Sequence, residues 1–217
     1  MEEHVAHVKV KICGLTREEE AQYLNDAGAD YAGFVFYEKS KRNVSIDQAV
    51  SIKKRLNPSI RSVAVTVDPD TDMIRKIEEA GFDIIQIHGG ITKEEVAAAS
   101  IPVWAAVNAK TSDEAEDRIR AIEDDLGELR DKIEAYIFDA PSFGSGVRSD
   151  WTGGGRPDTD KLFVLAGGLN SENVAEGIRI FKPDIVDASS SVEGSEGKDR
   201  DKVLDLINAA RKGGKNE

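Results

Sequence analysis

Short apolar segments alternate along the chain with longer segments in which apolar residues recur at helical spacing. In the segment 46–56, for example, the apolar residues stand at positions 46, 49, 50, 52 and 56. We expect strands at residues 8–13, 31–36, 61–67, 83–88, 103–107, 135–139, 162–166 and 185–189. The intervening pattern predicts helices at residues 17–27, 46–56, 71–80, 93–99, 113–132, 171–181 and 200–211.

Strands that each return through a helical crossover are typical of parallel pairing. Eight such crossovers of right-handed sense close into a (βα)8 (TIM) barrel, which we expect as a single α/β domain over residues 1–217. An open doubly wound sheet is the alternative, and periodicity alone does not decide between the two. The segment Trp151–Asp158 contains three consecutive glycines and a proline, so we expect the sixth helix to be short or missing.

Composition and charge exclude several classes of protein and of site. With a net charge of −12, the surface should repel nucleic acid and acidic membranes. No apolar run approaches the roughly 18 residues of a spanning helix. The polar, acidic N-terminus does not resemble a secretory signal, so we expect a cytoplasmic protein. The single cysteine, Cys13, excludes an intrachain disulfide, and His4, His7 and His88 share no metal-ligand spacing, so we expect no metal site.

The first predicted strand carries polar residues on one face. Positions 8, 10 and 12 are apolar and should pack on the helices, so Lys9, Lys11 and Cys13 should face the barrel interior. A buried lysine is costly unless it meets an anion, which makes Lys11 a candidate contact for an anionic ligand. Cys13 precedes a predicted helix start, where positive potential favours the thiolate. The alternatives, a solvated lysine at the rim and a small buried cysteine, stay open on this pattern.

Three further candidates stand at or just after strand ends, where the active site of a parallel barrel lies. Asp139 ends the sixth predicted strand and faces inward by alternation, either as a catalytic acid or as a cap of the next loop. His88 ends the fourth strand and faces inward, as a ligand contact or as a core histidine. Arg42 belongs to a basic cluster at residues 39–42 and is either a carboxylate anchor or part of a solvated charge run.

The loops after the seventh and eighth predicted strands have the composition of an anion site. Gly167 and Gly168 permit close approach of the backbone, and the free N–H groups of a helix follow directly. Ser189 and Ser190 add small donors after the eighth strand. Because these two loops form the usual phosphate site of (βα)8 barrels, we expect a phosphorylated ligand here rather than two ordinary turns. Such a ligand needs a locally positive pocket in a chain of this charge.

The motifs at these strand ends together resemble those of the phosphoribosylanthranilate isomerases. The first and last motifs, Lys11–Thr16 and Asp187–Ser190, are specific in combination. The others occur in the family's order, at Gly33–Tyr37, Ser40–Ser45, Gln86–Gly89, Gly144–Gly146 with Asp150 and Trp151, and Ala166–Asn170. The resemblance runs from about residue 8 to residue 210, which is nearly the whole chain.

The resemblance implies a cofactor-independent isomerase of tryptophan biosynthesis that acts on a small phosphorylated substrate, as a monomer or homodimer, and binds neither nucleic acid nor membrane. It implies an Amadori rearrangement of N-(5-phosphoribosyl)anthranilate to 1-(2-carboxyphenylamino)-1-deoxyribulose 5-phosphate. Cys13 would be the general base, with a pKa below the free value of about 8.5, and Asp139 the general acid. The implied substrate-binding residues are Lys11, Arg42, His88, Gly144, Gly146, Gly167, Gly168, Ser189 and Ser190.

The sequence departs from the family pattern at several positions. Ser191 stands where the family usually has glycine, which would strain the phosphate loop if φ there were positive. Asn43 replaces a common aromatic residue, and Val147–Ser149 replaces a stretch that usually resembles Lys-Thr-Phe. These departures concern substrate affinity rather than the catalytic pair.

Two other functions compete with this reading. Another phosphosugar barrel enzyme would use the same phosphate loops. A pentose-phosphate epimerase would need metal-binding histidines and acids, and the histidine-pathway isomerase would need an aspartate in place of Cys13. A barrel that binds a phosphorylated ligand without turnover is the second alternative. The inward placement of both Cys13 and Asp139 argues against it.

Overall fold

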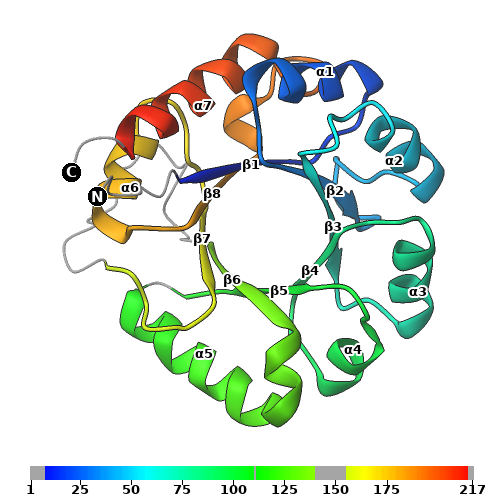
Figure 1. Ribbon diagram of the computed structural model, residues 1–217, viewed down its shortest axis with the longest axis vertical. Helices are drawn as coiled ribbons and strands as arrows, with labels where there is room; N and C mark the ends of the chain where they lie inside the picture. The colour runs from blue at the N-terminus through cyan, green and yellow to red at the C-terminus, as the bar shows by residue number, and fades with distance from the viewer. Residues whose placement is uncertain (1–7, 110, 140–154, 215–217) are drawn as a thin grey trace, which may run out of the picture.

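Eight parallel strands close into a barrel in chain order, and helices surround it (Figure 1). The computed structural model describes residues 8–109, 111–139 and 155–214. The strands are β1 (Lys9–Cys13), β2 (Tyr31–Phe36), β3 (Arg61–Val67), β4 (Ile84–His88), β5 (Val103–Val107), β6 (Ile133–Asp139), β7 (Leu162–Ala166) and β8 (Ile185–Ala188). The predicted barrel is therefore confirmed, and the open sheet is excluded because β1 pairs with both β2 and β8.

Seven α-helices and two 3₁₀ helices lie within the described residues. They are α1 (Glu18–Ala27), α2 (Ile46–Lys53), α3 (Thr71–Glu79), α4 (Lys93–Ala98), α5 (Ser112–Leu126), η1 (Gly127–Lys132), α6 (Val174–Phe181), η2 (Ser190–Val192) and α7 (Arg200–Gly213). Residues 155–161, before β7, contain no helix, as expected for the sixth connection. The rest of that connection, including 151–154, lies outside the described residues.

Two predicted helices differ from the observed ones for local reasons. The segment 113–132 is not one α-helix, because Gly127 has a φ of 59° and a ψ of −127°, and a 3₁₀ helix follows it. The helix after β7 begins at Val174 instead of residue 171. The Asn170 side chain accepts hydrogen bonds from the backbone N–H groups of Glu172 and Asn173, at 2.9 and 3.0 Å, and so holds a turn there.

Side-chain alternation divides the core into two layers. Val10 and Ile12 of β1 belong to the outer layer between strands and helices, as the sequence pattern predicts. Cys13 belongs to the inner layer within the barrel. The rings of Tyr31 and Trp104 meet edge to face there, with centroids 5.0 Å apart, and both are fully buried. Because large side chains fill the barrel interior, open space is left at the ends of the strands.

Side-chain caps fix where several of the helices begin. Asp70 accepts a hydrogen bond from the backbone N–H of Met73 at 2.7 Å at the start of α3. Thr92 and Glu95 form a reciprocal capping box at the start of α4. At the start of α7, Asp199 accepts two backbone hydrogen bonds. Within the described part of the chain, no helix is long and apolar enough to cross a membrane.

Candidate active site

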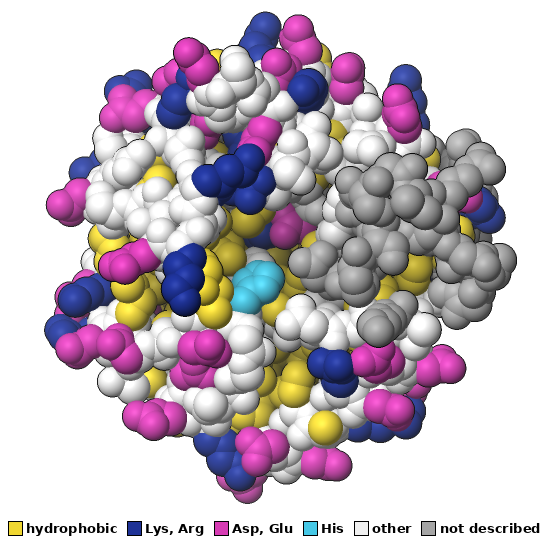
Figure 2. All heavy atoms as spheres, turned by 180° about the vertical axis from the view of Figure 1, so that it is seen from behind, with side chains coloured by type: hydrophobic (Ala, Val, Ile, Leu, Met, Phe, Trp, Pro, Cys, Tyr) yellow, Lys and Arg dark blue, Asp and Glu magenta, His cyan; other side chains and the backbone are white. Residues whose placement is uncertain are grey.

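A cavity of about 760 Å³ lies at the carboxyl-terminal ends of the strands. Figure 2 shows it as a hollow near the centre of one face, between apolar, basic and histidine side chains. Seven of the site residues predicted from the sequence line this cavity: Cys13, Arg42, His88, Gly167, Gly168, Ser189 and Ser190. The structure therefore brings together residues from five separate strand ends.

The structure does not show how three of the predicted site residues face the cavity. Asp139 ends β6, and its backbone pairs with Ala166 of β7, which lines the cavity. The side chain of Asp139 lies outside the described part of the structure. Gly144 and Gly146 also lie outside the described residues. Their assignments stay predictions.

Lys11 lies beneath the cavity and contacts an acid that the sequence analysis did not select. Its ammonium Nζ is 2.7 Å from Oδ2 of Asp187, and both side chains are buried. The two residues are paired neighbours on β1 and β8. Burial opposes the charge on Lys11, but attraction to Asp187 and Cys13 outweighs it, so the pKa of Lys11 lies above its ordinary value. A direct contact of Lys11 with a ligand stays a prediction.

Asp187 itself lines the cavity with one oxygen atom free. Its Oδ1 is buried and has no hydrogen-bond partner among the described residues. Burial raises the pKa of Asp187, although the charge of Lys11 opposes the shift. A buried acceptor without a partner is costly, so Oδ1 offers a hydrogen-bonding position for a group inside the cavity.

The pKa of Cys13 differs from the expected direction. Burial raises the pKa of the thiol above its ordinary value, and the nearby charge of Lys11 only partly offsets this. The start of α1 adds little positive potential, because the side chain of Glu20 accepts hydrogen bonds from the N–H groups of Thr16 and Arg17, at 2.6 and 3.2 Å. The resting side chain is therefore the thiol at neutral pH.

Two glycines make room around Cys13. A Cβ on Gly33 would lie 2.9 Å from the sulfur of Cys13, which is closer than real Cβ atoms come. Gly14 has a φ of 85°, and the side chain of Arg42 lies against it so closely that a Cβ would overlap the Arg42 Cδ. The candidate carboxylate anchor therefore packs against the residue that follows the candidate base.

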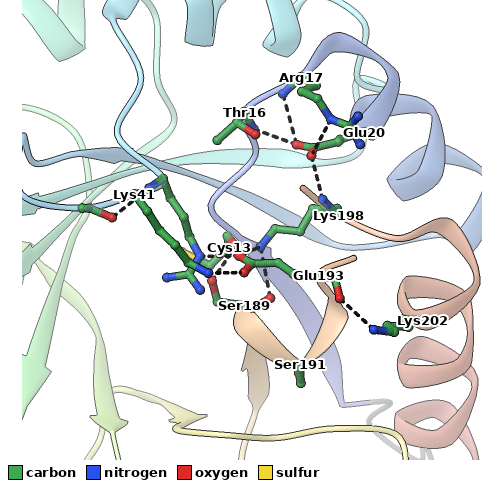
Figure 3. A network of polar contacts seen from close by, with 12 residues as sticks. Cys13, Thr16, Arg17, Glu20, Lys41, Ser189, Ser191, Glu193, Lys198 and Lys202 are labelled. Atoms are coloured by element: carbon green, nitrogen blue, oxygen red, sulfur yellow. Dashed lines mark hydrogen bonds and ion pairs between the residues drawn. The ribbon is translucent and has the colours of Figure 1, made fainter. Parts of the chain in front are cut away.

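Arg42 forms an ion pair with Glu193, which follows β8. The same carboxylate accepts hydrogen bonds from Lys41 at 2.9 Å and from Lys198 at 3.0 Å. Figure 3 shows Glu193 among these basic side chains, with Lys198 also reaching Ser189. Burial acts to raise the pKa of Glu193, but the hydrogen bonds from Arg42, Lys41 and Lys198 outweigh it and lower the pKa to about 2. The acid is thus ionised at every physiological pH.

His88 is half-buried at the cavity wall, so it is not a core histidine alone. Its Nε2 lies 2.6 Å from the amide nitrogen of Gln86. Burial, assisted by the charge of Lys11, lowers the pKa of His88 to about 4. The imidazole is therefore neutral at physiological pH and can offer a hydrogen bond or a ring face, but no charge.

The two predicted phosphate loops meet at the cavity. Gly167 and Gly168 have φ values of 93° and 62°, which other residues adopt only with strain. The hydroxyl of Ser191 donates to the carbonyl of Leu169 and so joins the β8 loop to the β7 loop. Ser191 lies in η2 and is not strained, because Asp68 and Lys182 are the described non-glycine residues with positive φ. The serine in place of the family's glycine is thus compatible with the loop.

The sequence analysis missed Asp187, Glu193 and Lys198 as parts of the site. Asp187 could have been found by alternation along the eighth strand, which turns it inward beside Lys11. Glu193 and Lys198 lie in the loop before α7, and nothing in their local sequence indicates burial. No group of three or more His, Cys, Asp or Glu suited to a metal occurs in residues 8–109, 111–139 and 155–214.

Comparison with known proteins points to one family. The family model of N-(5'-phosphoribosyl)anthranilate isomerase matches residues 10–209. A relative of that name from Streptococcus mutans is 37% identical over 205 residues, which cover 94% of this chain and 99% of the relative. A relative of the same name from Streptococcus pneumoniae is 36% identical over 213 residues, covering 94% and 96%.

Solved structures agree with the sequence relatives. The phosphoribosyl anthranilate isomerase of Thermotoga maritima has a TM-score of 0.79 at 32% identity and covers 94% of this chain and 99% of its own. A phosphoribosyl anthranilate isomerase in complex with reduced 1-(o-carboxyphenylamino)-1-deoxyribulose 5-phosphate has a TM-score of 0.76 at 31% identity, with the same coverage. The chain therefore belongs to the N-(5'-phosphoribosyl)anthranilate isomerase family and is an isomerase of tryptophan biosynthesis.

Proposed function

We propose that the chain isomerises N-(5-phosphoribosyl)anthranilate to 1-(2-carboxyphenylamino)-1-deoxyribulose 5-phosphate with Cys13 as general base and Asp139 as general acid. The observation that carries the role of Cys13 is its position in one cavity with Arg42 and the two predicted phosphate loops, while the role of Asp139 rests on the sequence resemblance. A substrate whose carboxylate meets Arg42 and whose phosphate meets Gly167 and Gly168 has its ribose between the two anchors, next to the strand ends.

The chemistry needs one acid and one base. Asp139 protonates the ribose ring oxygen, the C1′–O bond breaks, and the anilinic nitrogen lone pair forms a protonated Schiff base. Cys13 as thiolate then removes the C2′ proton, and the electron pair neutralises the iminium to give an enolamine, which tautomerises to the ketone. Although burial raises the pKa of Cys13, the positive Schiff base beside it favours the thiolate during this step.

Substrate binding divides between the two ends of the cavity. Ser189 and Ser190, with the backbone of Gly167 and Gly168, hold the phosphate through neutral donors. Arg42 binds the anthranilate carboxylate as a charge-assisted pair. His88 is neutral at physiological pH and contacts a part of the substrate other than its two anionic groups. Lys11 acts through Asp187, with which it forms an ion pair. The sequence resemblance adds Gly144 and Gly146 to the proposed substrate-binding residues. No cofactor takes part in these steps.

The roles of Cys13 and Asp139 are tested by variants that keep side-chain size. Cys13→Ser and Asp139→Asn should each lower turnover by roughly 10²-fold or more, which is the usual worth of a general acid or base. The loss of anthranilate fluorescence from freshly prepared substrate measures turnover directly. Near-wild-type turnover by either variant would remove that residue from its role. A folded wild-type protein without turnover would redirect attention to other phosphosugars.

The protein acts in the cytoplasm on a small phosphorylated substrate, as a monomer or as a homodimer. A structure of monomers generated from the dimeric phosphoribosylanthranilate isomerase of Thermotoga maritima has a TM-score of 0.75 at 32% identity to this chain. Sedimentation equilibrium of the full chain gives its mass directly, to be compared with the 23.6 kDa of one chain.

A further inference from the structure

Glu193 lies between the two anchors of the substrate but has no role in the mechanism above. Its carboxylate touches the Arg42 guanidinium on one side and the Lys198 ammonium on the other. Lys198 in turn donates to the backbone carbonyl of Ser189, at 3.1 Å, in the phosphate loop. The side chain of Lys198 is fully buried and that of Glu193 is 13% exposed, so this is a built interior contact rather than a surface ion pair.

We propose that Glu193 is a positioning residue that turns the terminal edge of the Arg42 guanidinium toward the substrate's carboxylate and, through Lys198, links this edge to the phosphate loop. The inference rests on the proposed role of Arg42 as the carboxylate anchor. It adds a determinant of specificity for acidic aromatic substrates that does not itself touch the substrate.

The geometry of the guanidinium decides which of its edges remains available. The carboxylate of Glu193 accepts a hydrogen bond from the Nε–H of Arg42. Among the described residues, neither terminal nitrogen of Arg42 has a hydrogen-bond partner, and the side chain lines the cavity. A guanidinium held by its side edge still offers two parallel N–H donors at its end, which match a carboxylate. The aliphatic part of the Arg42 side chain packs against Gly14, and this contact also restricts the position of the guanidinium.

Charge in the cluster also favours an anionic substrate. Three cationic side chains, those of Arg42, Lys41 and Lys198, share the single carboxylate of Glu193. The cluster therefore keeps a positive excess inside a chain of net charge −12. A bound carboxylate reduces this excess, whereas a neutral substituent does not. Because Glu193 itself lowers the excess, its contribution to carboxylate binding lies in orienting Arg42 and must outweigh this loss of positive charge.

A second buried acid holds the backbone that carries Lys198. Glu20 is fully buried, and its Oε1 accepts from the backbone N–H of Lys198 at 2.7 Å. Its Oε2 accepts from the backbone N–H of Thr16, three residues after Cys13. The loops after β1 and β8 are thereby joined through Glu20, as Figure 3 shows. These hydrogen bonds of Glu20 would resist a shift of Lys198 and, with it, of Glu193.

The test uses two stable ligands that differ only in the carboxylate. One is the reduced product, 1-(2-carboxyphenylamino)-1-deoxyribitol 5-phosphate, and the other is 1-phenylamino-1-deoxyribitol 5-phosphate. In Glu193→Gln, calorimetry should show roughly tenfold weaker binding of the carboxylated ligand, the usual scale for a lost charge-assisted contact, with the phenyl ligand changed by less than about twofold. In an Arg42→Ala background, Glu193→Gln should have no further effect on either ligand.

The matched control is Glu196→Gln in the same loop, where the glutamate side chain is 84% exposed. This variant should bind both ligands like the wild type. Equal loss of both ligands in Glu193→Gln, or no loss of either, would overturn the inference. A wild type that binds and discriminates the ligands but does not turn over the substrate would defeat the proposed reaction while leaving this inference standing. Thermal unfolding of each variant identifies any that fail to fold.

Discussion

The proposed base of this isomerase, Cys13, is a buried thiol that is protonated at rest. Burial is the largest influence on the pKa of Cys13 and raises it, while the charges of Lys11 and Asp187 act on it in opposite directions. The expectation of a lowered pKa came from the nearness of a helix start, which Glu20 neutralises in the folded chain. The direction therefore depends on a contact that is absent from the local sequence pattern.

This raised pKa has a kinetic consequence. The proposed base acts as the thiolate, so kcat/KM should rise with pH through neutrality as long as the proposed acid, Asp139, keeps its proton, and should level off only above the ordinary thiol range. The rate of alkylation of Cys13 by iodoacetamide, measured across the same pH range, should rise with the same midpoint. A kcat/KM that is flat between pH 6 and about 9 would indicate that the thiolate is already formed in the resting enzyme.

Alternation along single strands was enough to predict several residues of the site. It turned Lys11 and Cys13 inward on β1, as observed. It did not reveal the partner of Lys11, because the register that places it beside Asp187 comes from barrel closure over 176 residues of sequence. Glu193 and Lys198 were missed for a similar reason, because their burial depends on contacts between the loop after β8 and the loop after β1.

At the scale of elements, the proposed phosphate site depends on two loops that are held together. Ser191 joins the β8 loop to the β7 loop through the Leu169 carbonyl. The sequence predicted both loops from their glycines and serines, but not this connection. The start of α6 was also predicted too early, because the Asn170 side chain stabilises a turn where helical spacing alone continues the helix.

Removal of the Ser191 hydroxyl should loosen this site. Ser191→Ala should raise KM for the phosphorylated substrate by roughly three- to tenfold, the scale of one neutral hydrogen bond, with kcat changed by less than about twofold. Steady-state kinetics at saturating and limiting substrate separates the two constants. Ser171→Ala, in an exposed position of the β7 loop, is the matched control and should behave as wild type. A fall in kcat with unchanged KM would instead connect Ser191 to the chemical step.

At the scale of the whole molecule, one buried ion pair lies where the barrel closes. Lys11 of β1 and Asp187 of β8 are paired neighbours, and Figure 1 shows the two strands side by side. Removal of one partner leaves an uncompensated charge in the interior, so Lys11→Met should lower the free energy of unfolding by about 3–5 kcal/mol. Urea unfolding followed by circular dichroism measures this loss.

The pH dependence of that variant checks the cause. Without Lys11, Asp187 keeps a pKa above its unfolded value, so the carboxyl becomes neutral as the pH falls and the deficit should shrink in acid. The double variant Lys11→Met, Asp187→Leu should recover most of the stability at neutral pH but not the activity. Unchanged stability of Lys11→Met would show that the pair contributes nothing to closure.

The pairing of β1 with β8 also determines when, during synthesis, the chain can become active. Protein synthesis produces Cys13 long before it produces Asp187, Ser189, Glu193 and Lys198, which come much later in the sequence. A nascent or truncated chain that stops before residue 189 carries Cys13 without the Ser189 hydroxyl that donates to its backbone carbonyl, and one that stops before residue 198 lacks the Lys198 ammonium that donates to the Ser189 carbonyl. Turnover is thus reserved for chains that have been made almost to their last helix.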